Sequence, residues 1–258
     1  MSRRIRLDLA YDGTDYAGWQ VQRGQITIQS VLEAVLKRLN GDRAVSIRAA
    51  GRTDAGVHAR QQVCDFLFDG DAGDDDLAHA LGRMLPAEIR PLSLVTAAET
   101  FHARRSARRK HYRYRLDRSA FGSPIHARYA LHFPQELDTE ALADALGRLP
   151  GRHDWSGFTS SRCEVDDRVR ELKVAEYHER GGNARFDFEG DGFLTHMVRN
   201  LVGTLLEIGQ HKRPPVDIDR IVASEDRRMA GPTAPPQGLH LWNVTYQDSE
   251  AVRMLDRS

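Results

Sequence analysis

The sequence predicts an α+β fold with a mainly antiparallel sheet and flanking helices. Some segments alternate apolar and polar residues as strands do, and others repeat apolar residues at helical spacing. The two kinds of segment do not follow the regular strand–helix–strand order that is typical of parallel sheets. We therefore expect two α+β halves, one formed by residues 1–100 and the other by residues 101–258.

The first half begins with residues 4–11, where apolar and charged residues alternate and predict a strand with one polar face. Thr27 is suited to cap a helix whose apolar stripe runs toward Asn40. The aspartate-rich residues 69–76 precede a second helix, whose dipole favours acidic residues at its start. Further strands are expected at residues 45–50, 62–68 and 90–96, and the second helix carries Leu77, Leu81, Met84 and Leu85.

The second half is punctuated by prolines, which separate its expected elements. Strands are expected at residues 110–116, 169–178, 184–189 and 240–246, and helices at residues 138–148, 193–209 and 216–223.

The composition limits the class of protein. Hydrophobic residues make up 40% of the 258 residues, which is enough to bury a core and argues against a disordered chain. Cys64 and Cys163 lack the spacing of a zinc finger or a disulfide scaffold, and such cysteine usage fits a reducing compartment. Neither a signal peptide nor an apolar run of about 18 residues is evident. We therefore expect a cytoplasmic protein that does not associate with a membrane.

The charged residues are unevenly distributed, although the formal net charge is zero. Residues 104–118 contain one acid, Asp117, among the basic residues Arg104, Arg105, Arg108, Arg109, Lys110, Arg113, Arg115 and Arg118. His111, Tyr112 and Tyr114 lie between them, and aromatic rings among arginines favour RNA because they stack on unpaired bases. The simpler alternative, which is usual for charge runs, is a solvated charged face.

The segment GRTDAGVHA at residues 51–59 is the most informative stretch for a catalytic role. Its two glycines allow a tight turn and a close approach of the backbone to a ligand. A phosphate-binding loop is excluded, because Val57 and His58 stand where lysine and serine or threonine are needed. A metal site is weakly indicated by one aspartate and one histidine. The remaining alternatives are that Asp54 is a nucleophile held beside a guanidinium, or that it caps the backbone of its own turn.

This loop resembles the signature of the tRNA pseudouridine synthase A family over nine consecutive residues. The resemblance continues along nearly the whole chain, in YDGTDYAGWQ at 11–20, FHAR at 101–104, YRY at 112–114, FLTHMVRNLVG at 193–203 and TAPPQGLHL at 233–241. It implies the pseudouridine synthase fold, with two sheet-bearing halves around a basic cleft. It also implies a homodimer that acts without cofactor or metal on the anticodon arm of tRNA, at positions 38 to 40.

The resemblance assigns roles to residues of this chain. Asp54 is implied to be the catalytic nucleophile, Arg199 the arginine that pairs with it, and Tyr112 the active-site tyrosine. Arg52 is placed to fill the space left by a flipped base or to grip its phosphate. Without the resemblance, a surface arginine, a tyrosine packed in a sheet and a turn salt bridge would be the simpler interpretations. The expected RNA contacts are Arg52, Tyr112, Arg104, Arg105, Arg108 and Arg109.

The chemistry needs few groups. Pseudouridine formation breaks the N1–C1′ bond, turns the uracil and rejoins it through C5 without a redox change. One carboxylate suffices as a nucleophile at C1′, as in retaining glycosidases, and attack at uracil C6 or proton abstraction at C2′ are open alternatives.

Two other functional classes are alternatives to a pseudouridine synthase. An RNA-binding protein without catalysis would share the basic strip but would not need Asp54 or Arg199. A metal-dependent nuclease or hydrolase would need clustered carboxylates, and the aspartates at residues 69–76 are better explained as a helix start. His58 and His196 are expected to be hydrogen-bonded structural residues.

Overall fold

The computed structural model describes residues 2–161, 163 and 165–247. Contacts within the chain divide it into two compact units. The first comprises the residues up to Arg108 together with the described residues from Leu241 on, and the second comprises Arg109–His240. The sequence predicts a boundary near residue 100, and the contacts divide the chain after Arg108 and again after His240.

The first unit contains an antiparallel sheet. β1 (Arg3–Tyr11) lies between β4 (Ile89–Thr96) and β3 (His58–Phe68) and pairs antiparallel with both. The short β2 (Arg48–Ala49) also pairs with β3, and β10 (Leu239–Thr245) follows β3 in the order of the sheet. The long β3 therefore links β1, β2 and β10 in the sheet.

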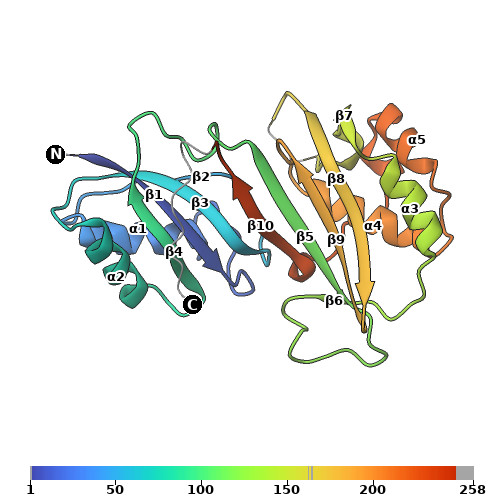
Figure 1. The fold of residues 1–258 in the computed structure, drawn as a ribbon, viewed down its shortest axis with the longest axis horizontal. Coiled ribbons are helices and arrows are strands. Elements are labelled where there is room, and N and C mark those ends of the chain that lie inside the picture. The colour runs from blue at the N-terminus through green and yellow to red at the C-terminus, as the bar shows by residue number, and fades with distance from the viewer. Residues whose placement is uncertain (1, 162, 164, 248–258) are drawn as a thin grey trace. The chain divides into compact units, whose positions relative to one another are not determined.

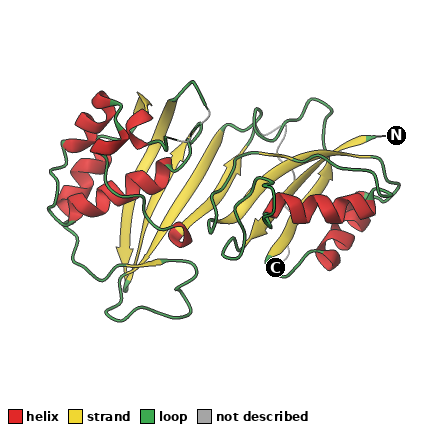
Figure 2. Cartoon of the chain, turned by 180° about the vertical axis from the view of Figure 1, so that it is seen from behind, coloured by secondary structure: helices red, strands yellow, loops and turns green. Residues whose placement is uncertain are grey.

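Helix α1 (Ile28–Leu39) covers one face of this sheet, behind β1 and β3 in Figure 1 and in front of them in Figure 2. Thr27 caps its start, as the sequence predicts, and Ser30 makes the cap reciprocal. The Thr27 hydroxyl accepts a hydrogen bond from the backbone N–H of Ser30, and the Ser30 hydroxyl accepts one from the backbone N–H of Thr27. Helix α2 (Asp74–Met84) begins with three aspartates and packs against β4.

The polar face of β1 is buried. Arg6 and Asp8 on this face are only 5% and 4% exposed, and Arg6 Nε lies 2.9 Å from Asp8 Oδ1. The Arg6 guanidinium also lies over the rings of Phe101 and Tyr246, at 5.6 and 4.6 Å from their centroids. The alternation therefore predicts the strand correctly, but residues from the segments that follow β4 and β10 cover the charged face.

The sheet strands of the second unit follow the order β5-β9-β8-β7. Its strands are β5 (Arg109–Asp117), β7 (Gly151–Asp154), β8 (Val169–Arg180) and β9 (Asn183–Gly190), and neighbours are antiparallel. The two-residue β6 (Leu131–His132) pairs parallel with β5. Tyr112 on β5 lies opposite Phe188 on β9.

The helices of the second unit lie on one face of its sheet (Figures 1 and 2). They are α3 (Thr139–Gly147), α4 (Met197–Gly209) and α5 (Asp217–Ser224), with short 3₁₀ turns at Ser156–Phe158, Arg227–Met229 and Pro236–Gly238. Helix α4 is almost entirely buried and packs against α3. No helix in the described part of the chain has the length and apolar character needed to cross a bilayer.

The α+β class and the mainly antiparallel pairing are confirmed, and three predicted elements differ markedly in length. The strand expected at 62–68 begins four residues earlier, at His58. Of the strand expected at 45–50, residues 48–49 form β2, and the backbone N–H of Ala50 also donates to the Val63 carbonyl on β3 at 2.8 Å. Before them, side chains of α1 bind the backbone of Ile47 instead. The helix expected at 193–209 begins at Met197, because His196 has a left-handed backbone with φ 63° and cannot continue a right-handed helix. β6 and β7 were not predicted, since two and four residues carry too little alternation.

Candidate active site

Asp54 lies in the loop between β2 and β3, and its side chain is half-buried. The loop closes on itself, because the Asp54 carbonyl accepts a hydrogen bond of 3.1 Å from the backbone N–H of Val57. Gly56 has φ 76°, a conformation that residues with a Cβ rarely adopt. The glycine expected from the sequence to permit a tight turn is therefore at the turn itself.

The segment after β1 holds this loop from one side. The backbone N–H of Trp19 donates to the Thr53 carbonyl at 3.0 Å, and that of Gly56 donates to the Tyr16 carbonyl at 3.3 Å. The approach requires glycine at Gly18, where a Cβ would lie 2.7 Å from the Thr53 carbonyl oxygen. The two motifs at residues 11–20 and 51–59 are thus one structural element.

Buried side chains hold the loop from beneath. The hydroxyl oxygens of Tyr11 and Thr53 are 2.8 Å apart, and Gln62 Nε2 donates to the Gly51 carbonyl at 2.8 Å. All three side chains are buried, and burial raises the pKa of Tyr11 well above its ordinary value. Tyr11 is therefore a neutral hydrogen-bonding group at any physiological pH.

His58 is buried and hydrogen-bonded, as expected. It is 2% exposed, and its Nδ1 accepts a hydrogen bond of 3.1 Å from the backbone N–H of Gly13. This contact ties the start of β3 to the segment that covers the Asp54 loop.

The other expected residues of the first unit lie on its surface. Arg52 is exposed in the Asp54 loop, and Arg104, Arg105 and Arg108 are exposed in the segment that leads into β5. Arg109, the fourth arginine of that group, is the first residue of β5 and of the second unit. Its Nη1 lies 2.8 Å from Glu189 Oε1, so part of its charge is already neutralised by a neighbour.

Tyr112 and Arg199 belong to the second unit. Tyr112 is 6% exposed and packs edge-on against Phe193, with ring centroids 4.9 Å apart. Arg199 is half-buried on α4, and its Nε donates to the Ala234 carbonyl at 2.7 Å. The backbone N–H of Ala234 in turn donates to the Arg199 carbonyl at 3.0 Å, so α4 and the segment at 233–241 are fastened together.

An ionic network aligns the strand that carries Tyr112. Asp187 on β9 accepts hydrogen bonds from His111 Nε2 at 2.7 Å and from Arg113 Nε at 2.8 Å, both on β5. Arg185 Nε donates to the same carboxylate at 2.8 Å. Burial alone would raise the pKa of Asp187, but these hydrogen bonds and charges hold it well below its ordinary value. Asp187 on β9 therefore binds His111 and Arg113, the two residues that flank Tyr112 on β5.

The candidate residues therefore lie in two groups, Asp54 with Arg52 in the first unit and Tyr112 with Arg199 in the second. The pairing of Asp54 with Arg199 stays a prediction. Within the described residues, no three histidine, cysteine, aspartate or glutamate side chains gather as a metal site would require.

Known proteins resemble the chain along nearly its whole length. A family model described as tRNA pseudouridine synthase matches residues 9–104 and 145–247. The chain is 43% identical to the tRNA pseudouridine synthase A of Geobacillus kaustophilus over 255 residues, which are 99% of each protein. It is 44% identical to the protein of the same name from Myxococcus xanthus, over 97% of this chain and 94% of that protein.

The chain belongs to the tRNA pseudouridine synthase family. It is accordingly an isomerase of tRNA, and the resemblance stated from its motifs is confirmed. The α+β architecture of its two units is that of a pseudouridine synthase.

The sequence did not reveal the residues that support the Asp54 loop of this synthase. Tyr11 and Gln62 lie on strands, where alternation marks them only as inward-facing. Asp65, also on β3, is fully buried and binds two arginines and a backbone amide. Its signal in the sequence is an acid at an otherwise apolar strand position, between Cys64 and Phe66.

Proposed function

We propose that this synthase converts uridine to pseudouridine in the anticodon stem-loop of tRNA, at positions 38 to 40, with Asp54 as its nucleophile. The observation that carries the proposal is the Asp54 loop. Its nine residues match the family signature, and hydrogen bonds from residues 11–19 and from buried side chains hold it in one conformation. A half-buried carboxylate on such a preorganised turn suits attack on a substrate that enters from solvent.

The proposed reaction exchanges one bond at C1′ for another, with no net gain or loss of atoms. The Asp54 carboxylate bonds to C1′ of the ribose while the N1–C1′ bond breaks and its electron pair stays on the uracil. The uracil turns, C5 bonds to C1′, and the carboxylate leaves with the electrons of its own bond. The proton on C5 then departs and N1 gains one, so that the product is an isomer of the substrate. Attack at C6 or proton abstraction at C2′ would use the same carboxylate.

The other candidate residues take supporting roles in this proposal. Arg52, exposed beside Asp54, fills the stack from which the target base is flipped or grips its phosphate. Arg199 supplies the positive charge that keeps the nucleophile ionised. Tyr112 contacts the uracil and relays the proton from C5.

Binding of the tRNA is assigned to its phosphates. Arg104, Arg105 and Arg108 are exposed on one short segment, and exposed arginines are the usual partners of a phosphate backbone. Arg109 is expected to contribute less because it also binds Glu189. The family resemblance further leads us to propose a cytoplasmic homodimer that needs no cofactor and no metal for the chemical step.

Mapping of the product tests the proposal. A tRNA transcript with uridines at positions 38 to 40 is incubated with the protein, and pseudouridine is located by base-specific chemistry. Pseudouridine is expected at these positions, and none is expected in a matched transcript that has cytidines there. Modification at other positions would refute the proposed substrate site. Tight binding without any product would favour the alternative of a binding protein.

A further inference from the structure

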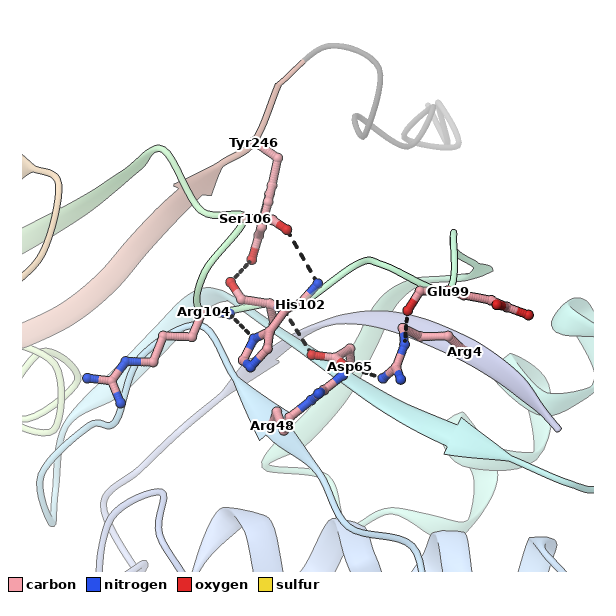
Figure 3. Close-up of polar contacts among 9 residues, drawn as sticks. Arg4, Arg48, Asp65, Glu99, His102, Arg104, Ser106 and Tyr246 are labelled. Carbon is pink, nitrogen blue, oxygen red and sulfur yellow. Dashed lines mark hydrogen bonds and ion pairs between the residues drawn. The ribbon is translucent and has the colours of Figure 1, made fainter.

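A second group of charged residues lies on the first unit, centred on the buried carboxylate of Asp65 (Figure 3). Arg4 Nη1 lies 2.7 Å from Asp65 Oδ2, and Arg48 donates to the same oxygen through Nε at 3.0 Å and through Nη2. The other oxygen, Oδ1, accepts a hydrogen bond of 2.8 Å from the backbone N–H of Ala103. Asp65 thus ties β1, β2 and β3 to the segment at residues 101–106.

This group carries more positive than negative charge. Two guanidinium groups share one carboxylate, and the Asp65 side chain is fully buried. The Arg4 side chain is 15% exposed, whereas that of Arg48 is 40% exposed. Arg48 therefore presents a cation that is held in place from below and is open to solvent above. A guanidinium fixed in this way has lost side-chain freedom before a ligand arrives.

The segment at residues 101–106 adds two further donor side chains, those of His102 and of the exposed Arg105. The His102 ring lies beside Arg48 in Figure 3, and its Nδ1 accepts a hydrogen bond of 3.2 Å from the backbone N–H of Arg104. The neutral ring therefore carries its proton on Nε2. Partial burial and the positive charges of Arg48 and Arg105 lower the pKa of His102, against the opposing effect of Asp65. Two cations thus act on the imidazole from two elements, β2 and its own segment.

A closed turn holds this segment in shape. The Ser106 hydroxyl accepts a hydrogen bond of 3.3 Å from the backbone N–H of His102, and the backbone N–H of Ser106 donates to the His102 carbonyl at 2.9 Å. Tyr246 adds a hydrogen bond of 2.7 Å from its hydroxyl to the Ala103 carbonyl. His102 and Arg105 are therefore presented by a fixed turn.

We propose that Arg48, His102 and Arg105 bind one phosphate of the RNA backbone, with Asp65 as the residue that positions Arg48. The inference rests on the proposed function, since the phosphate is that of the tRNA substrate. Arg48 and Asp54 lie on the same β2–loop–β3 hairpin, six residues apart. An extended chain of that length spans at most about 22 Å, so the phosphate belongs to a nucleotide near the one that reacts.

Salt dependence of tRNA binding tests this site. The dissociation constant of unmodified tRNA transcript is measured over a range of KCl concentrations for the wild type, Arg48→Gln, Arg105→Gln and the double variant. Loss of one phosphate contact lowers the slope of log Kd against log salt by roughly 0.7–0.9. Each single variant is expected to lose up to this amount. The double variant should lose less than the sum of the two, because both side chains serve one phosphate.

The matched control is Arg38→Gln, an exposed arginine on α1 that should leave the slope unchanged. Arg105→Gln removes no buried contact, so it keeps the test open if Arg48→Gln unfolds. Slopes for Arg48→Gln and Arg105→Gln that equal the control would overturn the site, and full additivity would overturn the single shared phosphate. Pseudouridine formation by the wild type, measured on the same samples, tests the proposed function separately.

The His102 ring offers a second readout. Its resonance is followed by NMR as a function of pH, and is assigned by its absence in His102→Gln. A phosphate beside the ring favours the protonated form, so bound tRNA is expected to raise the pKa of His102. An unchanged or lower pKa in the complex would contradict the contact.

Discussion

The hydroxyl oxygen of Tyr11 lies 2.8 Å from that of Thr53, the residue directly before Asp54. Both side chains are buried, at 4% and 6% exposure. The contact joins the end of the first strand to the loop that carries the proposed nucleophile. Because both hydroxyls are buried beside the Thr53–Asp54 peptide, we assign Tyr11 and Thr53 as residues that position this peptide.

Removal of either hydroxyl is therefore expected to slow catalysis more than binding. Tyr11→Phe or Thr53→Val leaves a buried hydroxyl without its partner, at a cost of about 1–3 kcal/mol that the loop relieves by shifting. We expect a single-turnover rate lowered by about tenfold or more, with the tRNA dissociation constant changed by less than about threefold. Thr53→Ser keeps the hydroxyl and should remain near the wild-type rate. Equal losses in rate and affinity, or no rescue by serine, would mean that the pair only stabilises the fold.

Tyr112→Phe tests the proposed proton relay. The phenylalanine ring keeps the packing against Phe193 but has no hydroxyl to accept the proton that leaves C5. General-base assistance is typically worth about 10²–10⁴-fold, so pseudouridine formation should slow by at least about a hundredfold while tRNA still binds. Single turnover on tRNA with tritium at uridine C5 follows this proton directly. Tritium release near the wild-type rate would reduce Tyr112 to a packing or stacking residue.

Asp187 should make the stability of the protein fall in acid. Its pKa in the folded protein is held below the ordinary value, so its contribution is complete above about pH 4 and is lost as the pH falls through the folded pKa. Asp187→Asn is expected to lower the free energy of unfolding at pH 7 by about 1.5–3 kcal/mol, because two arginines and His111 lose their shared acceptor. The difference from the wild type should shrink steadily below pH 4.

Glu176→Gln is the control for this effect, since Glu176 lies opposite Asp187 on β8 but its side chain is 58% exposed. It should change the free energy of unfolding by less than about 0.5 kcal/mol. Chemical denaturation between pH 3 and pH 7 gives these values. A constant difference between wild type and Asp187→Asn over that range would show that the carboxylate charge is not responsible.

Chelation tests whether the chemical step needs a metal. The proposed steps move electron pairs among carbon, nitrogen and one carboxylate, so no Lewis acid is required. Dialysed enzyme in excess chelator should convert tRNA at close to its normal single-turnover rate, provided that the tRNA is folded beforehand and monovalent salt keeps it folded. A chemical step that stops under chelation and returns with added divalent ion would contradict the proposed chemistry.

The sequence predicted the elements that repeat a pattern and the residues that match a motif. The alternation in residues 4–11 corresponds to β1, and Thr27 caps α1 as expected. Asp54 could be singled out because nine neighbouring residues carry the family signature. Local periodicity and local motifs are visible in one chain because the information lies within a few residues of the feature.

Long-range contacts could not be predicted in this way. The alternation identifies one face of β1 only as polar, and the fold brings Phe101 and Tyr246 over Arg6 on that face. His196 gives no sign in the sequence that its left-handed backbone delays the start of α4. Asp65 likewise appears as an isolated acid, and its two arginine partners lie 61 and 17 residues away.

The central claim is that the Asp54 carboxylate performs the isomerisation, and Asp54→Asn tests it most directly. The substitution keeps the size of the side chain and removes its charge and nucleophilicity. Pseudouridine is mapped in tRNA transcript under single-turnover conditions, with tRNA affinity and thermal unfolding measured on the same preparations. We expect no pseudouridine at any time point, with affinity within about tenfold of the wild type, or roughly 1.4 kcal/mol. Product formation by a folded Asp54→Asn protein at close to the wild-type rate would contradict the account.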